Sequence, residues 1–336
     1  MFPVFFMHIG QALDLVSRDD SLRNPLTSLG DYLDPELISR CLAESGTVTL
    51  RKRRLPLEMM VWCIVCMALE RKEPLHLIVN RLDIMLPGNR PFVAPSAVIQ
   101  ARQRLGSEAV RRVFTKTAQL WHNATPHPHW CGLTLLAIDG VFWRTPDTPE
   151  NDAAFPRQTH AGNPALYPQV KMVCQMELTS HLLTSMTDAM RFPGGEMAAL
   201  YSHRWEIELG YREIKQTMQL SRLTLRSKKP ELVEQELWGV LLAYNLVRYQ
   251  MIKMAEHLKG YWPNQLSFSE SCGMVMRMLM TLQGASPGRI PELMRDLASM
   301  GQLVKLPTRR ERAFPRVVKE RPWKYPTAPK KSQSVA

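Results

Sequence analysis

Apolar residues recur with a helical period over the first 125 residues, and turn-forming residues divide this stretch into short helices. Asp34-Pro35 begins one predicted helix, because proline fits the first turn of a helix. Pro56 likewise begins a second helix that runs to about Arg71, and a third is expected over about 74–86. This pattern predicts a helical N-terminal region with few strands.

Ser96 is positioned to cap a helix over Ala97–Leu105. Gly106 is expected to end this helix, because glycine readily adopts the backbone conformation found at helix C-termini. Ser107 then caps a further helix that runs through about Trp121. We therefore expect two consecutive helices separated at Gly106.

The pattern changes after a connector rich in proline and histidine at residues 123–131. Leu133–Ile138 is a short continuous apolar run ending at Asp139-Gly140, which is typical of a buried strand. Further elements are expected as a loop over 144–168, strands over 170–178 and 181–187, and helices over about 196–218, 231–258, 267–282 and 291–303. Together these elements predict an α/β fold with a large helical content.

Charge adds a candidate partner to this picture. The 336 residues carry a net charge of +12, which favours nucleic acid or an anionic surface as partner. Residues 309–336 hold nine basic and two acidic residues, a net charge of +7 in a short tail. A soluble basic protein without a nucleic-acid partner is the alternative.

Cysteine usage and hydropathy bear on the compartment. Cys63 and Cys66 form a C-x-x-C pair inside the apolar run Met59–Leu69, and without a second pair we interpret them as buried helix thiols in a reducing compartment. That run is too short to cross a membrane, which takes about 20 residues. The N-terminus lacks the basic region and cleavage site of a signal peptide, so we expect a cytoplasmic protein without a membrane partner.

Four residues of the helix expected over 196–218 carry candidate chemistry: Tyr201, Arg204, Glu208 and Lys215. In a regular α-helix their spacing places them within an arc of roughly 60°. One carboxylate flanked by two cations and a phenol suits a surface that handles phosphate and metal. A solvated helix face with an ion pair between Arg204 and Glu208 is the alternative.

Asp139 is the second candidate, at the end of the expected buried strand. A carboxylate at a strand end projects from the sheet edge, where phosphoryl-transfer folds hold a metal. The alternative is that Asp139-Gly140 only makes a turn after the strand.

These two elements together resemble the IS4 family of insertion-sequence transposases. Tyr201-x2-Arg204-x3-Glu208-x6-Lys215 matches the Y-R-E-K signature of that family at the same spacing. The segment around Asp139 resembles the strand that carries the family's first catalytic Asp. Further segments that resemble the family lie at residues 95–105, 143–147 and 315–326, so the likeness extends over nearly the whole chain.

The resemblance implies a ribonuclease-H-like domain in which an Asp-Asp-Glu triad holds two Mg²⁺ ions for DNA cleavage and strand transfer. Asp139 and Glu208 would be catalytic metal ligands, and Tyr201, Arg204 and Lys215 would contact DNA. It also implies a helical DNA-binding domain over 1–125, the catalytic domain over 130–258, C-terminal helices over 259–308 and a basic tail over 309–336. Partners would be double-stranded element ends and target DNA at the nucleoid, bound by a homo-oligomer.

The chain departs from the family pattern at the middle Asp of the triad. No motif of the family's middle-Asp type lies between Asp139 and Glu208, and Asp188 is the one strand-end candidate there. The expected strands over 170–178 and 181–187 nearly adjoin, where family members insert further strands and helices. We therefore predict an internal deletion that joins near residues 182–185, an incomplete ribonuclease-H-like core, and loss of DNA cleavage.

DNA binding does not depend on the triad. The helix over Ala97–Leu105 is a candidate recognition helix, with Gln100, Arg102 and Arg104 near bases or phosphates. A basic surface helix is the alternative. Two other functions stay open, namely a non-catalytic remnant that inhibits intact transposases, and a decayed product without function.

Overall fold

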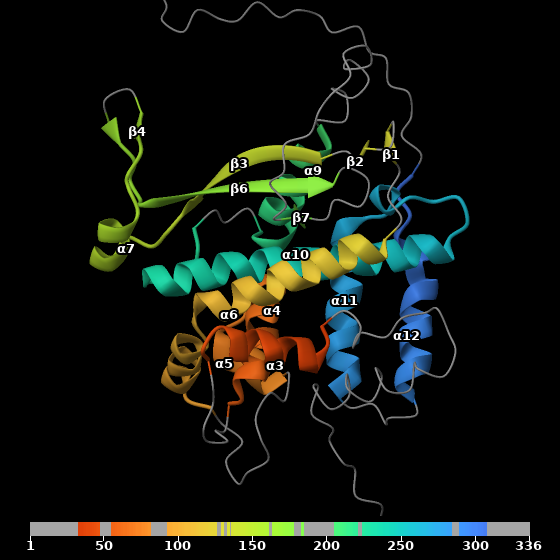
Figure 1. Cartoon of the computed structure of the whole chain (residues 1–336), viewed down its shortest axis with the longest axis horizontal. Coiled ribbons are helices and arrows are strands. Elements are labelled where there is room, and N and C mark those ends of the chain that lie inside the picture. The colour runs from red at the N-terminus through yellow and green to blue at the C-terminus, as the bar shows by residue number, and fades with distance from the viewer. Residues whose placement is uncertain are drawn as a thin grey trace, which may run out of the picture. The chain divides into compact units, whose positions relative to one another are not determined.

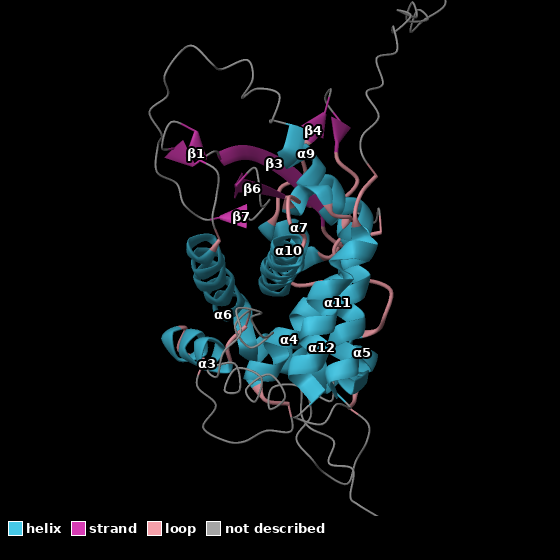
Figure 2. Ribbon diagram, turned by 90° about the vertical axis from the view of Figure 1, so that its right-hand side faces the viewer, coloured by secondary structure: helices cyan, strands magenta, loops and turns pink. Residues whose placement is uncertain are grey.

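A computed structural model describes residues 33–47, 55–81, 93–125, 129–130, 133–134, 136–160, 163–177, 183–184, 205–220, 224–283 and 289–307. One compact unit runs to Leu306, and a second begins at Pro307. The first unit is mostly helical with a small antiparallel sheet (Figures 1 and 2).

The N-terminal helices are α3 (Pro35–Glu44), α4 (Leu57–Leu69) and α5 (Leu75–Arg81). The carboxylate of Asp34 accepts the backbone N–H of Glu36 and so caps α3. These positions confirm the three predicted helices where they are described. Helix α4 is apolar on all sides and buried along nearly its whole length, as expected of a helix inside a core.

Helix α6 (Pro95–Ala124) is interrupted at Gly106, whose φ of 72° and ψ of 172° lie outside the helical region. The predicted separation of two helices at this glycine is therefore confirmed as a kink. The predicted cap is wrong, because the cap position is Ala94, and Pro95 and Ser96 already lie in the first turn. Proline supplies this helix start without a side-chain cap.

Helix α10 (Pro230–His257) lies at the centre of the first unit, and both α4 and α6 pack against it (Figure 1). Buried residues from these three helices belong to a single hydrophobic cluster. At Gly239 a Cβ would lie 2.2 Å from Cγ2 of Ile64, so α4 and α10 approach as closely as glycine allows. The boundary expected between 125 and 130 thus does not separate two hydrophobic cores.

The main sheet has the order β3-β6-β7, formed by β3 (Leu136–Arg144), β6 (Gln169–Glu177) and β7 (Leu183–Thr184). Strands β3 and β6 pair antiparallel along their full length, with Asp139 opposite Cys174. The predicted buried strand ending at Asp139 is wrong in three respects. Residues 133–134 form a separate strand, and Asp139 is an exposed residue in the middle of β3. Ile138 is also exposed, because it lies on the face of β3 turned away from the helices.

The segment predicted as a loop over 144–168 contains regular structure. Helix α7 (Pro149–Ala154) is capped by the Thr148 side chain, and β4 (Thr159–His160) pairs with β5 (Asn163–Pro164). A second small pairing joins β1 (His129–Trp130) to β2 (Leu133–Thr134). The proline and asparagine content of this segment marks cap and turn positions as well as loop.

The helix predicted over 196–218 is described from residue 205. It begins as α9 (Trp205–Arg212) and continues as the π-helix η2 (Glu213–Met218). The remaining elements are η3 (Pro263–Gln265), α11 (Phe268–Gln283), α12 (Ile290–Ser299) and η5 (Met300–Val304). Within the part of the chain that is described, no helix is both long and apolar enough for a membrane span.

Candidate catalytic site

Asp139 lies on the side of the β3–β6 ribbon that faces the helices. Residues directly opposite in an antiparallel pair share one face, so Asp139 lies on the same face as Cys174. Two residues further along, Val141 is buried on this face, whereas Asp139 itself is exposed. Its Oδ1 accepts the backbone N–H of Gly140 at 2.7 Å, which orients the carboxylate and leaves it open to solvent.

Tyr211 connects the helix of Glu208 to this strand. Its hydroxyl donates to the backbone carbonyl of Asp139 at 2.7 Å. Glu208 precedes Tyr211 by three residues in α9, so the two side chains lie on one face of the helix. Both predicted carboxylate residues therefore come from elements that contact each other at Asp139.

Burial explains why Tyr211 serves here as a neutral hydrogen-bond donor. Removal from water, together with the neighbouring thiol of Cys174, raises the pKa of Tyr211 above its ordinary value. Burial likewise raises the pKa of Cys174 to about 11, and the charge of Asp139 adds to this shift. Both groups thus stay protonated at neutral pH.

Gly210 permits the close approach of α9 to the sheet. A Cβ there would lie 2.3 Å from Cε of Met176 in β6 and 3.1 Å from the hydroxyl oxygen of Tyr244 in α10. Met176 is fully buried, so its methyl group has little room to move. The glycine next to Tyr211 thus allows α9 to pack between β6 and α10.

The π-helix that follows α9 is held by an ion pair between the half-buried Glu213 and the buried Arg248. Glu213, its first residue, accepts hydrogen bonds from Arg248 and from the hydroxyl of Tyr244, both in α10. Burial alone lowers the pKa of Arg248, but the neighbouring Glu213 and Tyr244 outweigh it and raise the pKa above its ordinary value. The guanidinium of Arg248 thus stays charged inside the core and holds Glu213 in place.

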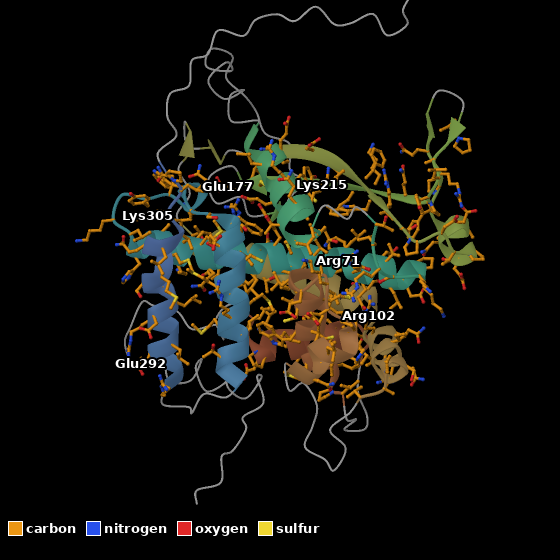
Figure 3. All side chains as sticks on the ribbon, turned by 180° about the vertical axis from the view of Figure 1, so that it is seen from behind. Arg71, Arg102, Glu177, Lys215, Glu292 and Lys305 are labelled. Atoms are coloured by element: carbon orange, nitrogen blue, oxygen red, sulfur yellow. The ribbon has the colours of Figure 1, made fainter. Side chains whose placement is uncertain are left out.

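This π-helix changes the predicted position of Lys215. The arc calculated for the four signature residues assumed a regular α-helix, and this assumption is wrong from Glu213 onward. The Nζ of Lys215 lies 5.9 Å from the ring centroid of Tyr211, so the cation lies next to the residue that joins α9 to β3. Figure 3 shows Lys215 beside the sheet. Tyr201, Arg204 and Asp188 lie outside the described residues.

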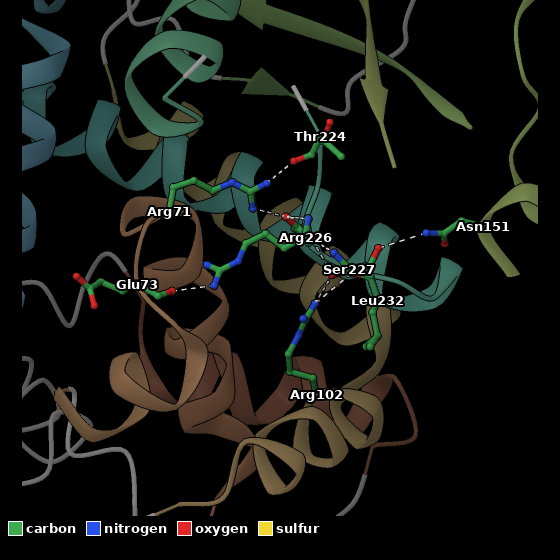
Figure 4. A network of polar contacts seen from close by, with 9 residues as sticks. Arg71, Glu73, Arg102, Asn151, Thr224, Arg226, Ser227 and Leu232 are labelled. Atoms are coloured by element: carbon green, nitrogen blue, oxygen red, sulfur yellow. Dashed lines mark hydrogen bonds and ion pairs between the residues drawn. The ribbon is translucent and has the colours of Figure 1, made fainter. Parts of the chain in front are cut away.

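Arg102 is not a surface residue, so its predicted contact with DNA is wrong. Its side chain is 3% exposed. The guanidinium donates to Gln235 at 2.9 Å. It also donates to Ser227 and to the carbonyl of Leu232 at 3.1 Å each (Figure 4). Burial lowers its pKa. A basic residue in a pattern typical of DNA binding can therefore make hydrogen bonds inside the protein instead of contacting a ligand.

The other two residues of the candidate recognition helix differ in exposure. Gln100 is exposed, and Arg104 is half-buried. The helical period places Arg102 on the face turned to α10 and Gln100 away from it. Of the three predicted DNA contacts in this helix, only Gln100 lies fully on the surface.

Sequence reasoning missed a polar network that surrounds Glu236 of α10 (Figure 4). Glu236 is 1% exposed. Its carboxylate accepts hydrogen bonds from Nη1 of Arg71 at 2.7 Å, from the backbone N–H groups of Arg226 and Ser227, and from the hydroxyl of Ser227. Arg71 also donates to the carbonyl of Thr224. This network joins the turn after α4 to the segment that precedes α10.

Two family models match the chain. One is described as the insertion element 4 transposase N-terminal domain, over residues 23–115, and the other as the transposase DDE domain, over residues 184–246. The chain is also 73% identical over 442 aligned positions to the transposase InsG of insertion sequence element IS4 from Escherichia coli K12, covering 98% of this chain and 100% of that protein. This chain belongs to the IS4 family of transposases.

A second relative from the same organism is described as the putative transposase InsZ. It is 37% identical over 163 residues, which cover 47% of this IS4-family chain and 53% of that protein. No solved structure matches the chain.

The alignment with the InsG transposase is longer than this chain. It has 442 positions against 336 residues, so at least 106 positions hold no residue of this chain. Because the alignment covers nearly the whole of both proteins, these positions interrupt the chain instead of extending an end. The IS4-family chain therefore lacks at least 106 internal positions relative to this transposase.

The DDE domain implies that the family uses a divalent metal. Asp139 and Glu208 supply carboxylate oxygens, the ligand type that hard divalent cations prefer. No cluster of three or more metal-ligating side chains is found within the described ranges. These two carboxylates come from a strand and a helix that contact each other at Asp139.

Proposed function

We propose that this IS4-family chain binds the DNA ends of its element but does not cleave them. The observation that carries this proposal is the absence of at least 106 aligned positions from the interior of the chain. The match to the DDE domain begins at residue 184, within the join predicted near residues 182–185. A deletion at that point removes the strand that carries the middle Asp together with its neighbours.

Asp139 and Glu208 are the two remaining catalytic carboxylates in this proposal. With Mg²⁺ as the ion, a bound metal would activate the attacking water and stabilise the leaving oxygen. The chain's own contribution is positioning, because Tyr211 holds the Glu208 helix on the Asp139 strand. Without the middle Asp the metal site is incomplete, and the donor set cannot clamp both oxygens.

Contacts to DNA phosphates are assigned to Lys215, Tyr201, Arg204 and the basic tail over 309–336. Gln100 and Arg104 remain candidates on the N-terminal helix, and Arg102 is excluded by its burial. Contacts of this kind release counterions, so affinity should fall steeply as salt rises. We place the protein at the nucleoid in the cytoplasm, as an oligomer on DNA.

An end-cleavage assay tests the proposal. Purified chain is incubated with a labelled duplex of an element end and Mg²⁺ or Mn²⁺, and the InsG transposase serves as positive control. We expect an end-specific gel shift without nicking. Nicking at the element end at a rate comparable to the control would overturn the proposed defect.

A second candidate function is inhibition of intact transposases. The 73% identity to the InsG transposase favours it, because a chain this similar would recognise the same ends. Adding the chain to a cleavage reaction of the intact enzyme should then lower the rate in proportion to end occupancy. An unchanged rate at saturating chain would exclude this role.

A further inference from the structure

One face of the β3–β6 ribbon carries large exposed apolar side chains. Strand residues alternate between two faces, and Val141, Trp143, Cys174 and Met176 are buried on the face turned to the helices. The opposite face, called the outer face, carries Ile138, Phe142 and Val173, which are 67%, 39% and 60% exposed. It also carries Lys171, whose Nζ lies 5.9 Å from the ring centroid of Phe142, and the buried Glu177 at one end. Figure 1 shows α10 on only one side of the ribbon.

Gly140 lies in the middle of the outer face, between Ile138 and Phe142 and opposite Val173. Its missing side chain leaves the strand backbone open to close approach by another element. Large exposed aliphatic side chains on both strands, around a glycine, are typical of a sheet face that another layer covers.

Within the described ranges, the edge of β3 away from β6 is also largely without a partner strand. Strand β6 pairs with all nine residues of β3, whereas the other edge has one strand bridge among the described residues, between Arg144 and Thr224. The hydroxyl of Tyr211 contacts one carbonyl, that of Asp139. A nine-residue strand with an open edge can pair with a further strand.

The segment that the chain lacks would enter the fold next to this surface. Strand β6 ends at Glu177, and the match to the DDE domain begins at residue 184. Residues 183–184 form β7, which pairs with the end of β6 at Gln175 and Met176. Both ends of a segment inserted between 177 and 184 would therefore lie in the sheet of the outer face.

We propose that the outer face and the open edge of β3 form a docking surface for the segment that the InsG transposase carries and this chain lacks. The chain binds this segment when it is supplied as a separate polypeptide. This inference rests on the proposed function, because it takes the deletion to lie between β6 and α9. The length of the segment, at least 106 positions, is enough to supply both a strand and a covering layer.

The test uses the full chain and, as probe, a polypeptide made of the InsG residues that align to the gap. We expect a 1:1 complex by analytical ultracentrifugation, and protection from amide hydrogen exchange over residues 136–144 and 169–177. Ile138→Asp and Val173→Asp should each weaken binding by about tenfold or more, because the complex would bury an unpaired carboxylate. Leu303→Asp is the matched control, since Leu303 is 74% exposed in η5 and should not change binding.

Three outcomes would overturn the proposal. The first is no complex while the chain unfolds cooperatively, and the second is a complex equally weakened by Leu303→Asp. The third is self-association of the chain alone that Ile138→Asp abolishes, which would make a second copy the occupant. The cleavage assay stays separate from this one, because a chain that nicks DNA alone refutes the proposed function whatever the probe does.

Discussion

Glu236→Gln removes the negative charge at the centre of the buried polar network around Glu236 of α10. The native carboxylate accepts Nη1 of Arg71, two backbone N–H groups and the hydroxyl of Ser227. Glutamine keeps the volume but turns one acceptor oxygen into an NH2 donor that faces other donors. Arg71 then stays inside the protein without the carboxylate charge that neutralises it, and it keeps the carbonyl of Thr224 as an acceptor.

The expected cost follows from the burial of both partners. Side chains of Arg71 and Glu236 are 5% and 1% exposed, so neither charge can recover its hydration by a small movement. Breaking one partner of a buried ion pair costs about 3–5 kcal/mol. A domain is stable by roughly 5–15 kcal/mol, so we expect Glu236→Gln to lose a large fraction of the free energy of unfolding.

Urea unfolding followed by circular dichroism measures this loss. The matched control is Glu292→Gln, because Glu292 pairs with Arg289 at 3.9 Å with both side chains more than half exposed. An exposed pair contributes about 0–1 kcal/mol, so the control should unfold near the native midpoint. A loss below about 1 kcal/mol for Glu236→Gln would refute the reasoning, since it would mean that the network is hydrated or loosely held.

Two further predictions concern the core. Gly239→Ala should cost about 1–3 kcal/mol by overpacking α10 against Ile64. At Gly273 in α11 a Cβ would meet only Nη2 of Arg277, at an ordinary contact distance of 3.6 Å, so Gly273→Ala should be neutral or stabilising, and equal unfolding midpoints would contradict this. Burial raises the pKa of Cys174 to about 11 and of Cys63 and Cys272 to about 12, whereas thiols of the unfolded chain titrate near about 8.5. The buried thiols therefore contribute fully to the free energy of unfolding below about pH 8.5, and this contribution is lost as pH rises toward their pKa values in the folded protein. Urea midpoints that stay constant from pH 8 to 11 would contradict the burial of these thiols.

Helix positions could be predicted from the sequence because their signals are local. Pro35, Pro56 and Gly106 act through their own backbone restrictions, and each marks a helix boundary or kink in the structure. The end of β3 could not be predicted in this way. Asp139-Gly140 has turn-forming residues, but pairing with Cys174 and Val173 of β6 keeps both in the strand.

The candidate site residues show the same difference between local signals and contacts with distant parts of the chain. The proximity of Asp139 and Glu208 rested on the family signature, and the contact that joins their elements is made by Tyr211, for which no sequence signal exists. The prediction that Arg102 contacts DNA failed because the burial of this residue depends on which helix packs against α6. That helix, α10, lies more than 100 residues away along the chain. The π-helix at Glu213 likewise depends on the distant Arg248.

The position of the gap relative to the core bears on what the chain can still do. Helices α4, α6 and α10 share one hydrophobic cluster, and the network around Glu236 joins them without using the end of β6. The deletion proposed between β6 and α9 would therefore remove neighbours of the sheet while leaving the contacts that hold the N-terminal helices to α10. Tyr211 and Gly210 keep α9 packed on the remaining sheet. Glu208 therefore stays in α9 even if the middle Asp of the triad is missing. The proposed deletion would thus leave the metal site incomplete while preserving the helices proposed to contact DNA.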